Sequence, residues 1–267
     1  MRHVGVRLAG VGLAAAVGAA CGQGPEPVPG EQATSISVPA GSQQAWCAGT
    51  GPPVVLVSGI GDEATSAQWV GVERTLAQDA HVCRYDRPGT GASSAPATAG
   101  RGADELVDEL DAVVRHAAGD DRVVLVAHSF GGYLAMVYAD RHPERVGGLV
   151  LVDALDPSVG LLRGTGVSTL DEVAMAREQL DLRDVEQAAA SVTELDGDPP
   201  LVVLSRGEDA TASWTAGQRH LASLSERSDS DVVAGAGHQI PSEAPQAVVA
   251  AVERLRDRSV VGQPARP

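Results

Sequence analysis

The sequence predicts one α/β domain built around a mostly parallel β-sheet. Short apolar runs rich in Val and Leu alternate with amphipathic segments along most of the 267 residues, and 43% of the residues are hydrophobic. Continuous apolar runs are typical of parallel strands buried on both faces, and the amphipathic segments between them are typical of crossover helices. This length and hydrophobic content suffice for a single large core.

Six apolar runs are predicted to be strands of this sheet: 53–59, 80–86, 122–129, 146–153, 200–207 and 230–238. Helices are predicted between and after them, near 66–78, 103–118, 130–141, 169–194, 213–225 and 244–257. The segment before the first run, 35–47, suggests a hairpin whose second strand carries Cys47.

The interval between the fourth and fifth runs is too long for one crossover helix. An inserted helical cap over about 156–198 is the simplest explanation. Within it, the segment 169–172 (TLDE) has the spacing of a capping box. The apolar side chains that could face a cleft are Val173, Leu180, Leu182 and Val185. A pair of surface helices with no gating role is the alternative.

The N-terminal segment resembles an export signal. Two arginines precede the uncharged stretch 8–20, whose length suits the core of a signal peptide and is too short to span a membrane. We therefore predict a signal peptide over 1–20 and an exported protein. The stretch ends in a sequence that resembles a bacterial lipoprotein box, so Cys21 is predicted to carry a lipid that anchors the chain to the cell membrane. Cleavage after Ala20 followed by secretion is the alternative.

The residues after Cys21 are rich in Pro and Gly, which is typical of a linker. We predict a flexible tether over 21–34, the folded domain over 35–260 and a disordered tail over 261–267. The formal net charge of −15 argues against nucleic acid as a partner, because an acidic surface repels polyanions. Membrane contact is expected only through the lipid anchor, and the oligomeric state stays open.

The segment 122–140 carries the strongest functional signal. An apolar strand runs directly into Ser129, and a helix follows. A serine hydroxyl becomes an effective nucleophile when a sharp strand-to-helix turn projects it toward a base, and that turn needs very small residues two positions before and after the serine. Ala127 and Gly131 meet this requirement, so Ser129 is the candidate nucleophile.

These residues resemble the α/β-hydrolase fold family, with Ala127 in place of the first glycine of G-x-S-x-G. Two further motifs are similar to those of the family: 58–61 (SGIG) stands where the family has H-G-x-G, and 86–93 (DRPGTGAS) matches D-x-x-G-x-G-x-S. The resemblance extends to exported actinobacterial members. It implies an eight-stranded, mostly parallel sheet flanked by helices, with a short helical cap between strands 6 and 7, and it gives the DRPGTGAS run a structural role.

The resemblance also implies an oxyanion hole made of two backbone amides. Phe130 would supply one, because its amide lies at the start of the helix that follows the nucleophile. Ile60 would supply the other, from the SGIG loop. Ser58 replaces the histidine of the family, so the hydrogen bonds that support this loop must differ.

His238 is the candidate base. It lies between the last predicted strand and the last predicted helix, where the family places its catalytic histidine. The other histidines are less suited, because they lie in the nucleophile turn, within strands or helices, or in the export signal: His3, His81, His116, His128, His142 and His220.

Two carboxylates could hold and stabilise the imidazole. Asp209 follows the 200–207 strand, the more common position in the family, but its spacing is one residue shorter than usual. Asp153 ends the 146–153 strand, a position the fold also uses. The pattern over 214–225 resembles exported actinobacterial hydrolases whose later loop often lacks the acid. This favours Asp153, with Asp209 as the alternative.

Cys47 and Cys83 remain as a pair once Cys21 is set aside. In the implied fold their strands are neighbours, and disulfides persist outside the cytoplasm. We therefore predict a disulfide between them that stabilises the fold by roughly 4 kcal/mol. Two buried free thiols are the alternative.

Together these residues predict a serine hydrolase that cleaves an ester or amide bond of a small-molecule acyl substrate through an acyl-enzyme intermediate. Neither a metal nor an organic cofactor is expected, because acid–base chemistry by the histidine suffices. The enzymatic alternatives are a proline iminopeptidase-like peptidase and a cofactor-free haloperoxidase-type enzyme. A membrane-tethered binding protein with a degenerate site is the non-enzymatic alternative.

Overall fold

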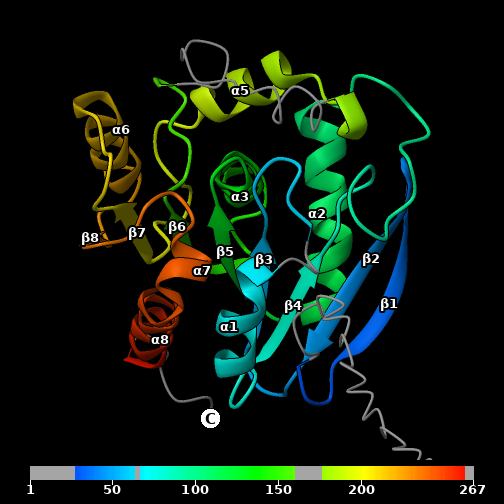
Figure 1. Cartoon of the computed structure of the whole chain (residues 1–267), viewed down its shortest axis with the longest axis horizontal. Coiled ribbons are helices and arrows are strands. Elements are labelled where there is room, and N and C mark those ends of the chain that lie inside the picture. The colour runs from blue at the N-terminus through cyan, green and yellow to red at the C-terminus, as the bar shows by residue number, and fades with distance from the viewer. Residues whose placement is uncertain (1–27, 64–66, 160–175, 262–267) are drawn as a thin grey trace, which may run out of the picture.

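The computed structural model describes residues 28–63, 67–159 and 176–261 (Figure 1). The predicted signal peptide, the lipidation site at Cys21, the capping box with Val173, and nearly all of the predicted tail lie outside these ranges. Within them, no helix is both long enough and apolar enough to cross a bilayer.

Eight strands form one sheet in the order β1-β2-β4-β3-β5-β6-β7-β8. The pairs β1/β2 and β2/β4 are antiparallel and all other pairs are parallel. This confirms the predicted mostly parallel, eight-stranded sheet. The strands are β1 (Gln32–Val38), β2 (Gly41–Ala48), β3 (Pro53–Val57), β4 (His81–Tyr85), β5 (Val123–His128), β6 (Val146–Val152), β7 (Leu201–Arg206) and β8 (Ser228–Val233).

Helices cover both faces of the sheet, as Figure 1 shows. On one face, the buried side chains of α1, α7 and α8 form a core with alternate residues of the strands, such as Val54 and Leu56. On the other face, α2, α3, α5 and α6 pack against the intervening residues, such as Val55 and Val57. The helices are α1 (Ala67–Leu76), α2 (Ala103–Ala118), α3 (Gly131–Arg141), α5 (Leu182–Ser191), α6 (Ala212–Ala222), α7 (Ile240–Glu243) and α8 (Pro245–Val261).

The first strand begins within the segment predicted to be a tether. Residues 32–34, assigned to the tether by composition, pair in register with β2. Before them, Val28 is buried, and Glu31 forms an ion pair with Arg84 of β4. Main-chain pairing and this ion pair hold a segment that has no apolar pattern of its own.

The C-terminal half of the sheet also departs from prediction. Strand β8 ends at Val233, so most of the predicted 230–238 strand forms the turn that carries His238. In place of one long helix over 169–194, α5 begins after Asp181, whose carboxylate accepts hydrogen bonds from two amides of the first turn. Leu182 and Val185, predicted to face a cleft, are buried in the core shared with α2 and α3.

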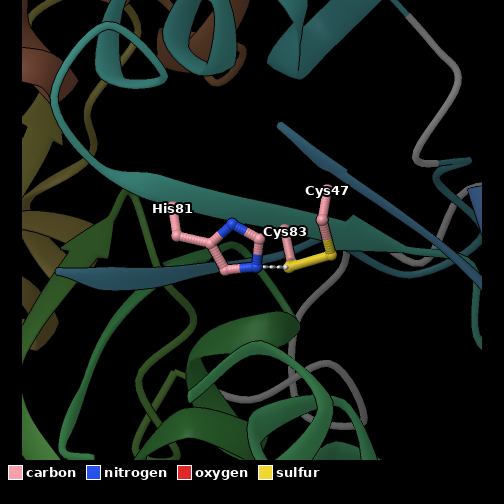
Figure 2. A group of neighbouring side chains, drawn as sticks. All are labelled: Cys47, His81 and Cys83. Atoms are coloured by element: carbon pink, nitrogen blue, oxygen red, sulfur yellow. Dashed lines mark hydrogen bonds between the residues drawn. A yellow bond between two sulfur atoms is a disulfide. The ribbon is translucent and has the colours of Figure 1, made fainter. Parts of the chain in front are cut away.

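Cys47 and Cys83 form the predicted disulfide (Figure 2). They are register partners on β2 and β4, and their Cα atoms lie 4.1 Å apart. The imidazole of His81 lies beside the bond, with Nδ1 3.1 Å from the carbonyl oxygen of Gly49 and Nε2 3.7 Å from the Cys83 sulfur. The three side chains have the spacing of a metal site, but the disulfide uses both sulfurs and leaves no thiolate to act as a ligand.

Candidate active site

Ser129 lies on the sharp turn that joins β5 to α3. Its φ angle is 53°, in the left-handed region that residues with side chains rarely adopt. The turn presses against the neighbouring strand, because a Cβ atom on Gly131 would lie 2.6 Å from the carbonyl oxygen of Val57. Ala127, two residues before the serine, is completely buried. Close contact with main chain therefore requires glycine at 131, and burial favours a small residue at 127. The turn presents the Ser129 hydroxyl at the carboxyl edge of the sheet.

The imidazole of His238 lies between Ser129 and Asp153. Its Nε2 is 3.0 Å from Ser129 Oγ, and its Nδ1 is 2.6 Å from Asp153 Oδ2. Asp153 directly follows β6, has a φ angle of 43° and is fully buried. When the ring proton is on Nδ1 it is donated to Asp153, which leaves Nε2 free to accept the proton of the serine hydroxyl.

Asp209 does not join this group. It lies in the loop between β7 and α6, and its side chain is exposed to solvent. The loop turns toward α6, whose first turn is capped by Thr211. Of the two carboxylates that the sequence left open, the structure therefore brings only Asp153 to the imidazole.

Two residues that the sequence did not single out as site residues hold Asp153. Arg206, the last residue of β7, donates from Nε to Asp153 Oδ2 at 2.7 Å and from its amide to Oδ1 at 3.0 Å. Trp214 of α6 donates from its indole to Oδ1 at 2.8 Å. Burial alone would raise the pKa of Asp153, but the hydrogen bonds from His238 and Arg206 lower it below the usual value of a carboxyl group. Asp153 is thus held as a carboxylate.

Arg206 also affects His238 directly. Its Nη2 lies 2.8 Å from His238 Nδ1, and its guanidinium stacks on the Trp214 ring at 4.1 Å. Burial lowers the pKa of His238, and positive charge on His128 and Arg206 lowers it further. The hydrogen bond and the negative charge of Asp153 raise it. The resulting pKa lies below that of a free imidazole. The imidazole of His238 is therefore mostly neutral near pH 7.

His128, the last residue of β5, supports the loop that carries His238. Its Nε2 donates to the carbonyl oxygen of His238 at 2.8 Å, and the two rings lie 4.6 Å apart. Gln68 of α1 donates to His128 Nδ1 and to the side-chain oxygen of Gln239, both at 2.9 Å. The side-chain amide of Gln68 thereby joins His128, which precedes Ser129, to the loop that carries His238.

The two segments that carry the predicted oxyanion donors lie beside Ser129. Phe130 follows it at the start of α3. The SGIG loop containing Ile60 packs on the same turn, because a Cβ atom on Gly59 would lie 3.4 Å from the Cβ of Ser129. Ser58 accepts a hydrogen bond from the indole of Trp69 at 3.0 Å. This bond supports the loop where the family has its histidine.

Sequence comparison identifies relatives over part of the chain. A model of the alpha/beta hydrolase fold matches residues 52–174. An uncharacterised protein of Mycobacterium tuberculosis is 38% identical over 113 residues, which cover 40% of this chain and 30% of the relative. A 2-hydroxy-6-oxo-2,4-heptadienoate hydrolase of Pseudomonas putida is 38% identical over 117 residues, which cover 43% of this chain and 42% of the relative. The match therefore spans less than half the length of these curated relatives.

Structural comparison extends the likeness to most of the chain. A thermophilic esterase from Thermogutta terrifontis has a TM-score of 0.61 and 21% sequence identity, covering 85% of this chain and 99% of the esterase. At this identity the likeness shows the fold alone. The sequence match over 52–174 and the eight-stranded architecture together show that the chain has the α/β-hydrolase fold.

Proposed function

We propose that the protein is a serine hydrolase that cleaves carboxylic esters through an acyl-enzyme intermediate. The observation that carries the proposal is the continuous hydrogen-bond chain from Ser129 through His238 to Asp153, with distances of 3.0 and 2.6 Å. A serine, a neutral imidazole and a buried carboxylate in this order are the parts that nucleophilic acyl transfer needs.

The reaction has two halves. Ser129 Oγ attacks the acyl carbon as His238 Nε2 takes the hydroxyl proton, and the resulting oxyanion accepts hydrogen bonds from the amides of Ile60 and Phe130. The tetrahedral intermediate collapses, His238 gives the proton to the departing alkoxide, and the acyl group stays on Ser129. Water then attacks the acyl-enzyme with His238 as base, which releases the acid and restores the serine.

Asp153 stabilises the imidazolium that forms in both halves. Its low pKa keeps it charged at neutral pH, and its fixed partners keep the imidazole oriented. An ester is favoured over an amide as substrate because an alkoxide leaves with less help from the general acid than an amine does.

The test is covalent labelling with a fluorophosphonate followed by hydrolysis of p-nitrophenyl acetate, butyrate and octanoate. We expect the label on Ser129, loss of labelling and hydrolysis in Ser129→Ala, and full activity in the control Ser191→Ala, since Ser191 lies at the exposed end of α5. Absence of both labelling and hydrolysis in the folded wild-type protein would reject the proposal in favour of a binding protein.

A further inference from the structure

A buried ion pair lies beside the proposed oxyanion hole and takes no part in the Ser129–His238–Asp153 chain. Arg87, the second residue of the DRPGTGAS run, donates to the carboxylate of Glu178 from Nε at 2.7 Å and from Nη2 at 3.2 Å. The side chains are 2% and 0% exposed. Two charges removed from water this completely need further hydrogen bonds to offset the cost of desolvation.

Those further bonds all go to the SGIG loop. Arg87 donates from Nη1 to the carbonyl oxygen of Ser58 at 2.8 Å and from Nη2 to that of Gly59 at 2.6 Å. Glu178 accepts a hydrogen bond from the amide of Gly61 at 2.7 Å. The main chain is thus held on both sides of Ile60, the residue proposed to donate to the oxyanion.

The same guanidinium also contacts the side chain of Phe130, the residue whose amide is the second proposed donor. Its central carbon lies 5.6 Å from the centre of the Phe130 ring, which is completely buried. Arg87 therefore contacts both segments that form the proposed hole, one through hydrogen bonds and the other through a ring face.

Glu178 is itself fixed from the opposite side. Arg101, which is paired with Glu109, donates to the carbonyl oxygen of Glu178. Gly89 packs so closely that a Cβ atom there would lie 2.8 Å from the Cα of Glu178. The carboxylate is thus presented to the loop by a rigid environment.

We propose that Arg87 and Glu178 are positioning residues that fix the Ile60 amide for the oxyanion. This rests on the proposed serine hydrolase function. The pair fits such a role better than a purely stabilising one, because a buried ion pair adds little net stability, whereas a misplaced oxyanion donor costs a large part of the turnover rate.

The test compares Arg87→Lys and Glu178→Gln with the control Glu73→Gln. Glu73 is equally buried and pairs with a buried arginine, Arg84, at 2.5 Å, but this pair joins α1 to β4 and does not contact the SGIG loop through any hydrogen bond between described residues. Lysine keeps a positive charge near Glu178, but its single ammonium group cannot donate hydrogen bonds to two carbonyl oxygens and a carboxylate in the arrangement that the guanidinium allows. Active sites are counted with a fluorophosphonate, and kcat and KM for p-nitrophenyl butyrate are measured per labelled site.

We expect kcat to fall about 10- to 100-fold in both loop variants, with KM changed by less than about threefold, and kcat to be unchanged in the control. Free guanidinium should partly restore the rate of Arg87→Ala. If Glu178→Gln does not fold, Arg87→Lys carries the test. A kcat within twofold of wild type in the folded loop variants, or an equal loss in the control, overturns the positioning role. An inactive wild-type protein overturns the proposed function instead.

Discussion

The carboxylate of Asp153 is the most heavily hydrogen-bonded group of the site. His238, Arg206 and Trp214 all donate to it, and it is fully buried. Asp209 follows the neighbouring strand and is exposed. The two aspartates are therefore the same residue type in different environments. The same substitution can be made at both positions, so that each serves as the control for the other.

We expect Asp153→Asn to lower kcat by about 10³-fold or more, because an amide cannot stabilise the imidazolium or hold the reactive tautomer. Asp209→Asn should leave kcat within about twofold of wild type. Hydrolysis of p-nitrophenyl butyrate, with circular dichroism to confirm folding, measures both. A large loss in Asp209→Asn and none in Asp153→Asn would reverse the assignment.

Arg206 should set the lower end of the pH range of activity. The charged and titratable side chains in contact with His238 are Asp153, Arg206 and His128, and the guanidinium disfavours the imidazolium. Arg206→Met removes that charge, so the pKa of His238 rises and the base is protonated at a higher pH. The acid limb of the kcat/KM profile should move to higher pH.

The control for this prediction is Arg254→Met. Arg254 pairs with Asp229 and Asp231 on β8, away from the imidazole. Its profile should coincide with that of the wild type. An acid limb that stays in place or moves to lower pH in Arg206→Met would show that the guanidinium does not govern the protonation of His238.

At the level of elements, the junction of β5 and α3 determines where Ser129 lies. Gly131 allows α3 to begin directly against β3. A side chain at this position would clash with main-chain atoms of β3 and the loop after it, which cannot move aside as a flexible side chain could. The helix cannot shift without moving Ser129, because the serine carbonyl accepts hydrogen bonds from the amides of Gly132 and Leu155.

Gly131→Ala should therefore destabilise the protein by roughly 1–3 kcal/mol through overpacking and lower kcat by displacing the turn. Urea unfolding and ester hydrolysis measure the two effects. Gly147→Ala in β6 is the matched control, since its Cβ would meet nothing closer than 3.5 Å. Equal stability of the two variants would show that the close approach at Gly131 is not required.

Across the whole molecule, the features that a short stretch of sequence determines could be predicted from the sequence. The central strands follow from continuous apolar runs, and Ser129 follows from a motif that a short segment contains. Glu178 and Gln68 carry no such signal, because they reach the site from segments far apart in the chain. Arg206 could have been found, because it ends the strand next to β6 and the carboxyl ends of parallel strands meet at one edge of the sheet.

The disulfide joins the antiparallel edge of the sheet to its parallel part, since β2 carries Cys47 and β4 carries Cys83. The bond closes a loop with a sequence separation of 36 residues, for which chain entropy gives a stabilisation of about 4 kcal/mol.

The double variant Cys47→Ala, Cys83→Ala should lose about this much free energy of unfolding in guanidinium chloride. Addition of a reductant should destabilise the wild type but not the variant. The carboxyl edge that holds Ser129 lies on the strands beyond β4, so the folded variant should hydrolyse p-nitrophenyl butyrate as fast as the wild type if the proposed function holds. A loss below about 1 kcal/mol would mean that strand pairing alone holds the edge.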